Sequence, residues 1–535
     1  MGESTQRGPS RYGASVASER VDVVVVGAGH NGLVAATLLA RAGLRVRVFE
    51  QHGVVGGAAR TERPFAKAPG LGTSTGAYLL GLMPPELLRK LGIDLPLVRR
   101  DPHYFLPTTG RRYLLLGSDS RAVRDQMLAF FSEADFRAHE ALQAEIAQLR
   151  DDVAATWLME PLSIEQTAER FVRPTLRRVF VDLCRNPVGQ YLDRFGFRSE
   201  LLKAMYAVTD GFSGLNGDWD TPGTGMNFLV HNMCRLPGAD GTWMIVRGGM
   251  GTVGRTLAEA ARSAGARIET GRGVRRIVLQ GSTASGVELQ DGAEIGARAI
   301  VVNADPFRMR DLVGSERLPS AYNARIDGYL RDGTTLKVNL ALRDLPRFSC
   351  LPEDRGQFGS TMHLLPDEPQ VMAAMRAAFA DVKAGRLPEL PTIEWYVHTT
   401  VDPSLRDAEG RHNSALFVQW VPYSLRGTTW EAEEERYVRR LLAICDRFAP
   451  GTTDLVVDTF PLSPPKIEQH FGITRGHIHH VDNSFGFADR LPYSTPLQGL
   501  YSASAGCHPA GSVIGAAGHN AAAVVLRDLG TAAIT

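Results

Sequence analysis

VDVVVVGAGHNG, the stretch from Val21 to Gly32, decides the fold of this chain. Its apolar run leads into three glycines spaced as GxGxxG, a pattern typical of a strand that turns directly into a helix over the diphosphate of a dinucleotide. Gly27 permits the tight turn, Gly29 lets the backbone approach the phosphates, and Gly32 lets the helix pack on the strand. The helix N-terminus then presents unpaired N–H groups and a positive dipole end to the anion.

The residues that follow complete this nucleotide-binding unit. Small and apolar residues over 35–42 predict the helix, Gly43 ends it, and residues 45–49 predict the next strand. Glu50 closes that strand, where a carboxylate can accept hydrogen bonds from the ribose hydroxyls. The register of strand, glycine turn, helix, strand and acid distinguishes the motif from an ordinary glycine-rich turn.

A second glycine pair favours FAD among the dinucleotides. Gly56 and Gly57 let the chain fold back over the cofactor, and Arg60 offers a fixed cation to phosphate oxygens. At the other end of the chain, residues 500–504 predict a strand that runs into a small-residue loop and an alanine-rich helix. Such a helix entry forms another backbone cradle for an anion. We therefore expect both ends of the chain to assemble the FAD site.

The length and composition of the chain limit the classes of protein to which it can belong. A chain of 535 residues exceeds what one hydrophobic core organises, so two domains are expected. Lysine and arginine number 59 against 58 acids, a balance that lacks the basic excess of an extended nucleic-acid footprint. The apolar runs are too short to cross a bilayer, and residues 1–20 are predicted to be a disordered tail without the apolar core of a secretory signal. We expect a cytoplasmic protein and leave peripheral contact with a membrane open.

Cysteine and histidine spacing argues against dithiol and metal chemistry. The five cysteines lie far apart and form no CxxC pair, which disfavours both a dithiol-relaying reductase and a cysteine-rich zinc site. His477, His479 and His480 form a cluster, but no HExxH or similar ligand pattern accompanies it, so a role in a loop or strand is expected. We predict no metal site.

The middle of the chain predicts a second structural region. Residues 122–157 carry a long helical pattern, and the glycine-rich residues 211–225 predict a connecting loop. The apolar strand 299–302 can return to the parallel sheet, and residues 303–306 are interpreted as a strand end followed by a proline turn. From about residue 311 to 490, predicted strands mix with helices, which indicates a separate substrate region.

These motifs resemble the phytoene desaturase-like branch of the amine-oxidase-type flavoproteins. The resemblance runs from Gly27 to Asp528 and includes GAGHNGL, VVGGAART, GGMGTV, GVELQDGAEI, VVNADP and TPLQGLYSASAGCHPAGSVIGAAGHNAA. It implies an α/β fold with a Rossmann-like FAD-binding domain, discontinuous in sequence, and a second substrate-binding domain of mixed sheet and helices. The expected segments are 21–75, 243–310 and 491–535 for the first domain, and 76–242 and 311–490 for the second.

The same resemblance implies roles for single residues. The backbone around Val274 would meet the adenine, and the loop from Gly506 to Ile514 would meet the ribityl chain and the flavin. The chain departs from the family pattern beside this loop, at residues 510–512, at His519 and in the shorter segment 483–492. The residues expected to bind FAD are Gly27, Gly29, His30, Asn31, Gly32, Glu50, Gln51, Gly56, Gly57, Ala58, Arg60, Val274, Gly506, Val513 and Ile514.

The function expected is that of an FAD-dependent dehydrogenase or desaturase, which removes a hydride and a proton from an apolar or conjugated small molecule to form a double bond. His508 and His231 are the candidates for proton transfer, because histidine is the side chain most easily tuned for acid–base work. Only one nucleotide fingerprint follows a strand, so reoxidation by oxygen, a quinone or another carrier is favoured over a nicotinamide nucleotide.

Two alternatives fit the same sequence. A flavin-dependent isomerase would use the reduced cofactor to move a double bond without net oxidation. A non-catalytic interaction protein that keeps the fold is the second alternative, and the altered motifs at Ala510 and His519 favour it. Substrate identity and oligomeric state do not follow from the sequence.

Overall fold

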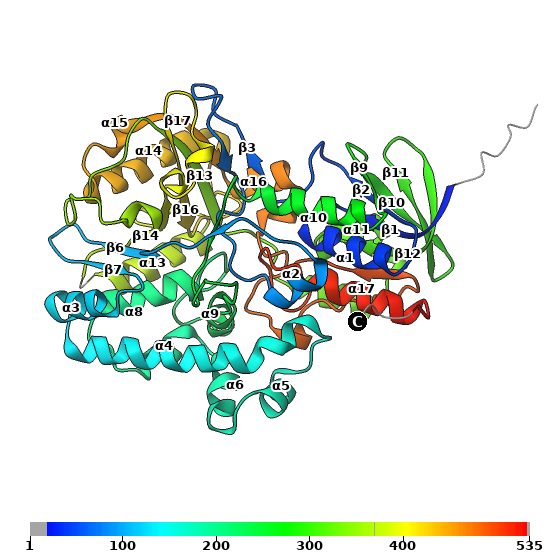
Figure 1. Ribbon diagram of the computed structural model, residues 1–535, viewed down its shortest axis with the longest axis horizontal. Coiled ribbons are helices and arrows are strands. Elements are labelled where there is room, and N and C mark those ends of the chain that lie inside the picture. The colour runs from blue at the N-terminus through cyan, green and yellow to red at the C-terminus, as the bar shows by residue number, and fades with distance from the viewer. Residues whose placement is uncertain (1–18, 369, 532–535) are drawn as a thin grey trace, which may run out of the picture.

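The computed structural model describes residues 19–368 and 370–531. Two lobes lie side by side, each built around one large sheet (Figure 1). In the first sheet, the central strands are parallel to one another, and an antiparallel hairpin extends one edge. The strand order is β10 (Val274–Gln280), β11 (Thr283–Leu289), β12 (Glu294–Val302), β1 (Glu19–Val26), β2 (Val46–Glu50) and β9 (Arg267–Thr270), and β18 (Leu500–Ser502) also pairs with β12.

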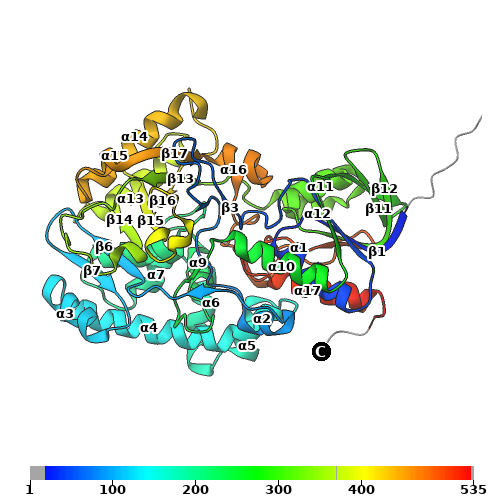
Figure 2. The same cartoon turned by 45° about the horizontal axis from the view of Figure 1, so that its top comes forward.

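Three helices with many small residues cover this sheet. Helix α1 (His30–Arg41) packs against both α10 (Gly251–Ser263) and α17 (Ala516–Asp528), and the three run together beside the strands in Figure 2. The valines at the centre of β1 are inaccessible to solvent, as expected for a parallel strand in the middle of a covered sheet. The two chain ends therefore meet in one core, and the expected α/β class is confirmed.

The predicted N-terminal tail is wrong at its last two positions. Glu19 and Arg20 extend β1 and lie opposite Ile295 and Gly296 of β12. The longer neighbouring strand supplies backbone hydrogen-bond partners, and these outweigh the polar composition that suggested disorder. Residues 1–18 lie outside the described part of the chain.

The second lobe contains a sheet that is antiparallel except at one pair, with helices around it. Its order is β17 (Val456–Leu462), β13 (Thr335–Leu342), β16 (His412–Gln419), β15 (Thr392–Tyr396), β14 (Thr361–Leu364), β6 (Tyr104–Pro107) and β7 (Tyr113–Leu116). The helices of this half are α3 (Ser120–Phe130), α4 (Glu133–Val153), α5 (Ile164–Phe171), α6 (Arg177–Arg185), α7 (Val188–Asp193), α8 (Glu200–Tyr206), α9 (Thr224–His231), α13 (Val371–Lys383), α14 (Trp430–Phe448), α15 (Thr452–Leu455) and α16 (Pro464–Phe471).

Short elements connect the lobes and fill their edges. Two small ribbons pair β3 (Thr61–Glu62) with β4 (Thr73–Ser74) and β5 (Leu97–Val98) with β8 (Ile245–Val246). The remaining helices are α2 (Pro85–Leu91), α11 (Pro306–Val313) and α12 (Ser320–Asp327). The strands of the first sheet come from three separate stretches of the chain, and those of the second sheet come from the two stretches between them, as expected for a discontinuous domain. The exact domain boundaries stay a prediction.

One local interpretation needs correction. Residues 303–306 were expected to end in a proline turn, but Pro306 is the first residue of α11, and the Asp305 carboxylate accepts the Arg308 N–H at 2.9 Å. Proline suits a first helical position because its missing N–H would have had no partner there. Among the described residues, no helix is long and apolar enough to span a bilayer.

Candidate FAD and substrate site

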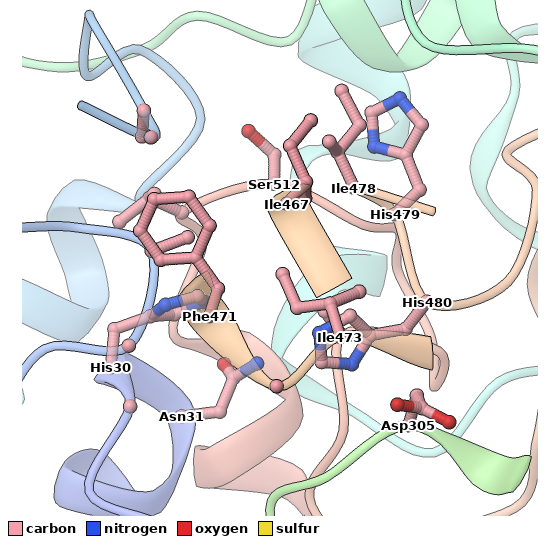
Figure 3. Close-up of a pocket in the computed structure, with 18 of the residues that line it drawn as sticks. His30, Asn31, Asp305, Ile467, Phe471, Ile473, Ile478, His479, His480 and Ser512 are labelled. Carbon is pink, nitrogen blue, oxygen red and sulfur yellow. The ribbon is translucent and has the colours of Figure 1, made fainter. Parts of the chain in front are cut away.

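A cavity of about 520 Å³ lies between the two lobes. One end is lined by the glycine turn after β1 and by Glu50, and the other by side chains from the sheet of the second lobe. Figure 3 shows the middle of this space, where His30 and Asn31 from the start of α1 and His479 and His480 from the loop after α16 surround it. A single space therefore joins the expected cofactor residues to the expected substrate region.

The glycines of the fingerprint are required by their close contacts. A Cβ at Gly29 would lie 2.7 Å from the side-chain amide of Asn303, and one at Gly32 would lie 2.2 Å from the Gly27 carbonyl oxygen. Gly27 itself has a φ of +95°, a conformation that other residues rarely adopt. The turn thus brings backbone N–H groups to the cavity wall with no side chain in the way.

Glu50 is fixed at the end of β2 before any ligand binds. One carboxylate oxygen accepts the Ala28 N–H at 2.8 Å and the other accepts the His52 N–H at 2.9 Å. The side chain is buried in the protein yet lines the cavity. A carboxylate held in this way is preorganised to accept hydrogen bonds from a diol.

Two buried polar atoms at the glycine turn lack a protein partner. These are Nε2 of His30 and Oδ1 of Asn31, and both residues line the cavity. Burying polar atoms without hydrogen bonds is costly, so their arrangement fits a polar ligand such as the diphosphate and ribityl part of FAD. The residues at this end of the cavity therefore suit the cofactor.

The structure brings most of the predicted cofactor residues to this wall. The residues that line it are Gly27, Gly29, His30, Asn31, Glu50, Gln51, Gly57, Ala58, Val274 and Val513. The remaining five, Gly32, Gly56, Arg60, Gly506 and Ile514, are not part of the wall. Arg60 donates to the Gly57 carbonyl at 2.7 Å and stacks on Phe471, which does line the cavity. Arg60 therefore supports the wall, and direct contact with FAD stays a prediction for the whole set.

The C-terminal loop is held at the cavity by buried polar contacts. Arg490 donates to the carbonyls of Ala505 at 2.9 Å and Cys507 at 3.0 Å. Asn483 accepts the Gly511 N–H at 2.9 Å, and a Cβ at Gly511 would lie 2.4 Å from the His479 backbone. Residues 510–512, which depart from the family pattern, therefore keep Gly511, the glycine that this packing requires.

The substrate end carries charged groups that sequence reasoning missed. Lys337 on β13 extends between two rings, with its Nζ 4.1 Å from the Tyr78 centroid and 4.5 Å from that of Phe417. Burial lowers the pKa of Lys337 to about 7, against the opposing attraction of Glu394. The only signal in the sequence was a lysine within an otherwise apolar strand.

Glu394 on β15 is an ionised carboxylate in the same wall. Its Oε2 accepts the Tyr396 hydroxyl at 2.5 Å, and its Oε1 lies 3.4 Å from Nε2 of His363. Burial acts to raise the pKa of Glu394, but the interaction with His363 and the hydrogen bond from Tyr396 hold it below its usual value. The buried carboxylate therefore has one partner on its own strand and one on the neighbouring strand β14.

Asp210 is the third ionisable group at this end. It lies in a π-helical turn, Ala207–Gly211, and one of its oxygens accepts the Asn232 amide at 3.1 Å. Burial raises the pKa of Asp210 to about 7, which the Asn232 hydrogen bond partly offsets. π-Helical turns occur frequently at functional sites, and this one aims a carboxylate at the cavity.

The two predicted catalytic histidines have different positions. His231, the last residue of α9, lines the cavity, and burial lowers its pKa to about 4, which keeps it neutral. His508 does not reach the cavity wall, because its Nε2 is bonded to the Thr156 carbonyl at 2.9 Å and its ring packs on Phe487. His508 therefore does not face a ligand that would occupy the cavity.

Each histidine of the cluster His477, His479 and His480 contacts another group of the protein. His477 lies 3.4 Å from Asp482, His479 bonds to the Ser213 carbonyl and His480 to the Ser504 hydroxyl, each at 3.0 Å. Within the described ranges, no group of three or more metal-ligating side chains could hold an ion.

The sequence matches a known protein family over more than half of the chain. Residues 32–356 match the family described as flavin containing amine oxidoreductase. The chain belongs to this family. FAD is the cofactor of this flavin-containing amine oxidoreductase, and the protein is an FAD-dependent oxidoreductase.

Relatives cover nearly the whole length of this flavin-containing amine oxidoreductase. The chain is 34% identical to pyridine nucleotide-disulfide oxidoreductase domain-containing protein 2 of Mus musculus, over 95% of this chain and 94% of the relative. It is 27% identical to hydroxyneurosporene desaturase of Cereibacter sphaeroides, over 95% and 98%. The crystal structure of an oxidoreductase from Methanosarcina mazei has the same fold, with a TM-score of 0.61, 17% identity and coverage of 95% and 100%.

Proposed function

We propose that this protein is an FAD-dependent dehydrogenase that removes a hydride and a proton from a small, largely apolar or conjugated molecule and leaves a double bond. The observation that carries this proposal is the continuous cavity, in which the glycine turn and Glu50 share one space with the aromatic and charged wall of the second lobe. The name of the Cereibacter sphaeroides relative, a desaturase, supports the same reaction class.

The residues at the first end of the cavity would hold the cofactor. The backbone of the glycine turn would face the diphosphate and Glu50 would face the ribose, while Val513 and its neighbour Ser512 extend the wall from the C-terminal loop. When bound, FAD supplies a hydride acceptor. Oxygen or a quinone is the proposed final electron acceptor.

Asp210 would accept the proton that leaves with the hydride. A general base works best when its pKa lies near the working pH, and burial raises the pKa of Asp210 to about 7. Asn232 fixes one carboxylate oxygen, so the other is free to meet the substrate. His231, one of the two candidates expected from the sequence, is a weaker acceptor because its pKa is lowered to about 4.

The test is an anaerobic screen of the FAD-loaded protein against conjugated lipids, amines and aromatic metabolites, with flavin bleaching as the readout. A substrate should bleach the flavin and yield a product that lacks two hydrogens. Asp210→Asn should slow bleaching roughly 100-fold or more without loss of bound FAD, whereas His508→Asn should bleach at the wild-type rate. Bleaching of Asp210→Asn at the wild-type rate would remove the proposed base, and a product with an unchanged number of hydrogens would indicate the isomerase instead.

A further inference from the structure

Lys337 presents an unpaired nitrogen to the substrate end of the cavity. The residue is buried on β13, and it lines the cavity. Among the described residues, its Nζ forms no hydrogen bond and no ion pair, and it lies between the rings of Tyr78 and Phe417. An aromatic ring accepts no conventional hydrogen bond, so the N–H groups of Lys337 are available to a ligand. The ammonium and the neutral amine both carry such donors, and this availability therefore does not depend on the charge of the lysine.

The charged groups of this wall favour a neutral ligand over an anion. Glu394 and Asp210 line the cavity beside Lys337, and the charge of Glu394 acts on the pKa of both other groups. Burial brings the pKa of Lys337 down to about 7 and that of Asp210 up to about 7, whereas the pKa of Glu394 is held below its usual value. An anionic group on Lys337 would therefore lie near an ionised carboxylate. A carbonyl oxygen accepts the same hydrogen bond without bringing a charge.

The proposed base, Asp210, needs a substrate of the same kind. Asn232 holds one of its carboxylate oxygens at 3.1 Å and leaves the other free to take a proton. A carboxylate is too weak a base for an unactivated alkyl C–H bond. Carboxylates do remove a proton from the carbon next to a carbonyl group when a hydrogen-bond donor stabilises the oxygen. A carbonyl group would therefore use both the free oxygen of Asp210 and the free donors of Lys337.

We propose that the substrate is a neutral carbonyl compound such as a ketone, that Lys337 donates a hydrogen bond to its carbonyl oxygen, and that the double bond forms between the α- and β-carbons. This inference rests on the proposed function and adds the substrate class to it. The α-proton passes to Asp210, the β-hydrogen leaves as a hydride to FAD, and the electron pair of the α-C–H bond becomes the new double bond. The substrate thus loses two hydrogens and two electrons, while Lys337 stabilises the negative charge that develops on the oxygen.

The first test follows exchange of the α-hydrogens, which requires Asp210 and Lys337 but no hydride transfer. The FAD-loaded protein is incubated anaerobically in D₂O with straight-chain and cyclic ketones, and with carboxylic acids of the same carbon skeletons. Mass spectrometry of the recovered compounds measures the deuterium gained above the level in buffer. We expect exchange in the ketones and none in the acids. Lys337→Met, which has no N–H donor, should slow exchange roughly 100-fold or more, and Lys337→Arg should retain part of the rate.

The second test reports on the hydrogen bond itself. An α,β-unsaturated ketone of the product class, labelled with ¹³C at the carbonyl carbon, is bound to the FAD-loaded protein and its carbonyl stretch is measured by infrared spectroscopy. A hydrogen bond from Lys337 should lower the stretching frequency relative to that in an apolar solvent. Lys337→Met should reverse this shift, whereas Asp210→Asn should keep the shift and abolish α-hydrogen exchange.

A lysine outside the cavity provides the matched control. Lys383 on α13 is exposed, and its Nζ lies 5.8 Å from the centroid of the Phe379 ring. Lys383→Met also removes an ammonium that lies over an aromatic ring, and it should leave the exchange rate and the infrared shift unchanged. Retained FAD and an unchanged thermal midpoint show that the variants are folded.

The outcomes separate this inference from the proposed function. Flavin bleaching by hydrocarbons, alcohols or amines with no response to ketones would overturn the carbonyl substrate and leave a dehydrogenase standing. Equal exchange in Lys337→Met and the wild type, or loss of FAD from both Lys337 variants, would remove the lysine from the substrate site. Lys337-dependent exchange and infrared shift without flavin bleaching by any ketone would overturn the dehydrogenase reaction and leave the carbonyl subsite.

Discussion

The side-chain amide of Asn303 accepts the backbone N–H of Gly29 at 3.2 Å. In the orientation that satisfies both ends of the amide, its oxygen also accepts the Gly32 N–H and its nitrogen donates to the Ala503 carbonyl, each at 3.2 Å. Asn303 follows β12, and Ala503 follows β18, so one side chain joins the glycine turn to two neighbouring strands. The turn that faces the cavity is therefore held by a residue far along the sequence, which also lines the cavity.

This amide gives the first prediction. Asn303→Asp can still accept both N–H groups, but its carboxylate can no longer donate to Ala503, so we expect weaker FAD binding and a loss of about 1–3 kcal/mol in the free energy of unfolding. Asn323→Asp is the matched control, because Asn323 makes similar amide contacts to the Ser315 and Leu318 carbonyls away from the cavity. Retained FAD and chemical denaturation measure the effect. Equal behaviour of the two variants would refute the role of Asn303.

The helix entry should be intolerant of a single methyl group. Gly32→Ala would place a Cβ 2.2 Å from the Gly27 oxygen, so the turn must shift, at a cost of about 1–3 kcal/mol and with loss of FAD. Gly53→Ala is the control in the same region, because a Cβ there meets nothing within 4 Å. Thermal unfolding with and without added FAD distinguishes them. An alanine at position 32 that keeps full FAD content would contradict the packing argument.

Glu50 should contribute to cofactor affinity through its charge. Glu50→Gln keeps the size of the side chain but removes the ionised acceptor, and we expect FAD to bind roughly 10- to 100-fold more weakly. Glu294→Gln, at an exposed position on β12 of the same sheet, should bind FAD as the wild type does. Fluorescence titration of the apoprotein with FAD gives both dissociation constants. A glutamine variant with unchanged affinity would mean that Glu50 serves only the backbone N–H groups of Ala28 and His52.

Stability should fall in acid because of buried neutral histidines. Burial lowers the pKa of His398 from 6.5 to about 3, so the unfolded chain takes up a proton that the folded chain refuses. The neutral His398 therefore supports folding fully above pH 6.5, and this contribution is lost as the pH falls below 6.5. Replacement by phenylalanine should remove up to about 1 kcal/mol per pH unit from the slope of unfolding free energy below that pH. Denaturation curves over this range measure it, and identical slopes for both proteins would disprove it.

The sequence by itself determined the cofactor end of this protein. The glycines of the fingerprint, Glu50 and the second glycine pair act through backbone geometry and over short chain distances, so their spacing already predicts a turn, a strand and a ligand. The pattern of strand, small-residue loop and helix near the C-terminus also predicted that the two chain ends meet, and the pairing of β18 with β12 is how the fold brings them together. Local chemistry sufficed because each of these residues has its role within its own turn or strand.

Only the tertiary structure determined which residues form the substrate end of the cavity. Lys337, Glu394 and Asp210 come from β13, β15 and a π-helical turn, and each looks in the sequence like one charged residue among apolar neighbours. Sheet pairing and burial bring them to one cavity and shift their pKa values. The same packing puts His231 on the cavity wall and His508 behind it, although both are histidines beside glycine-rich loops. Burial and proximity arise from contacts between distant segments, and for that reason the pattern along the chain could not supply them.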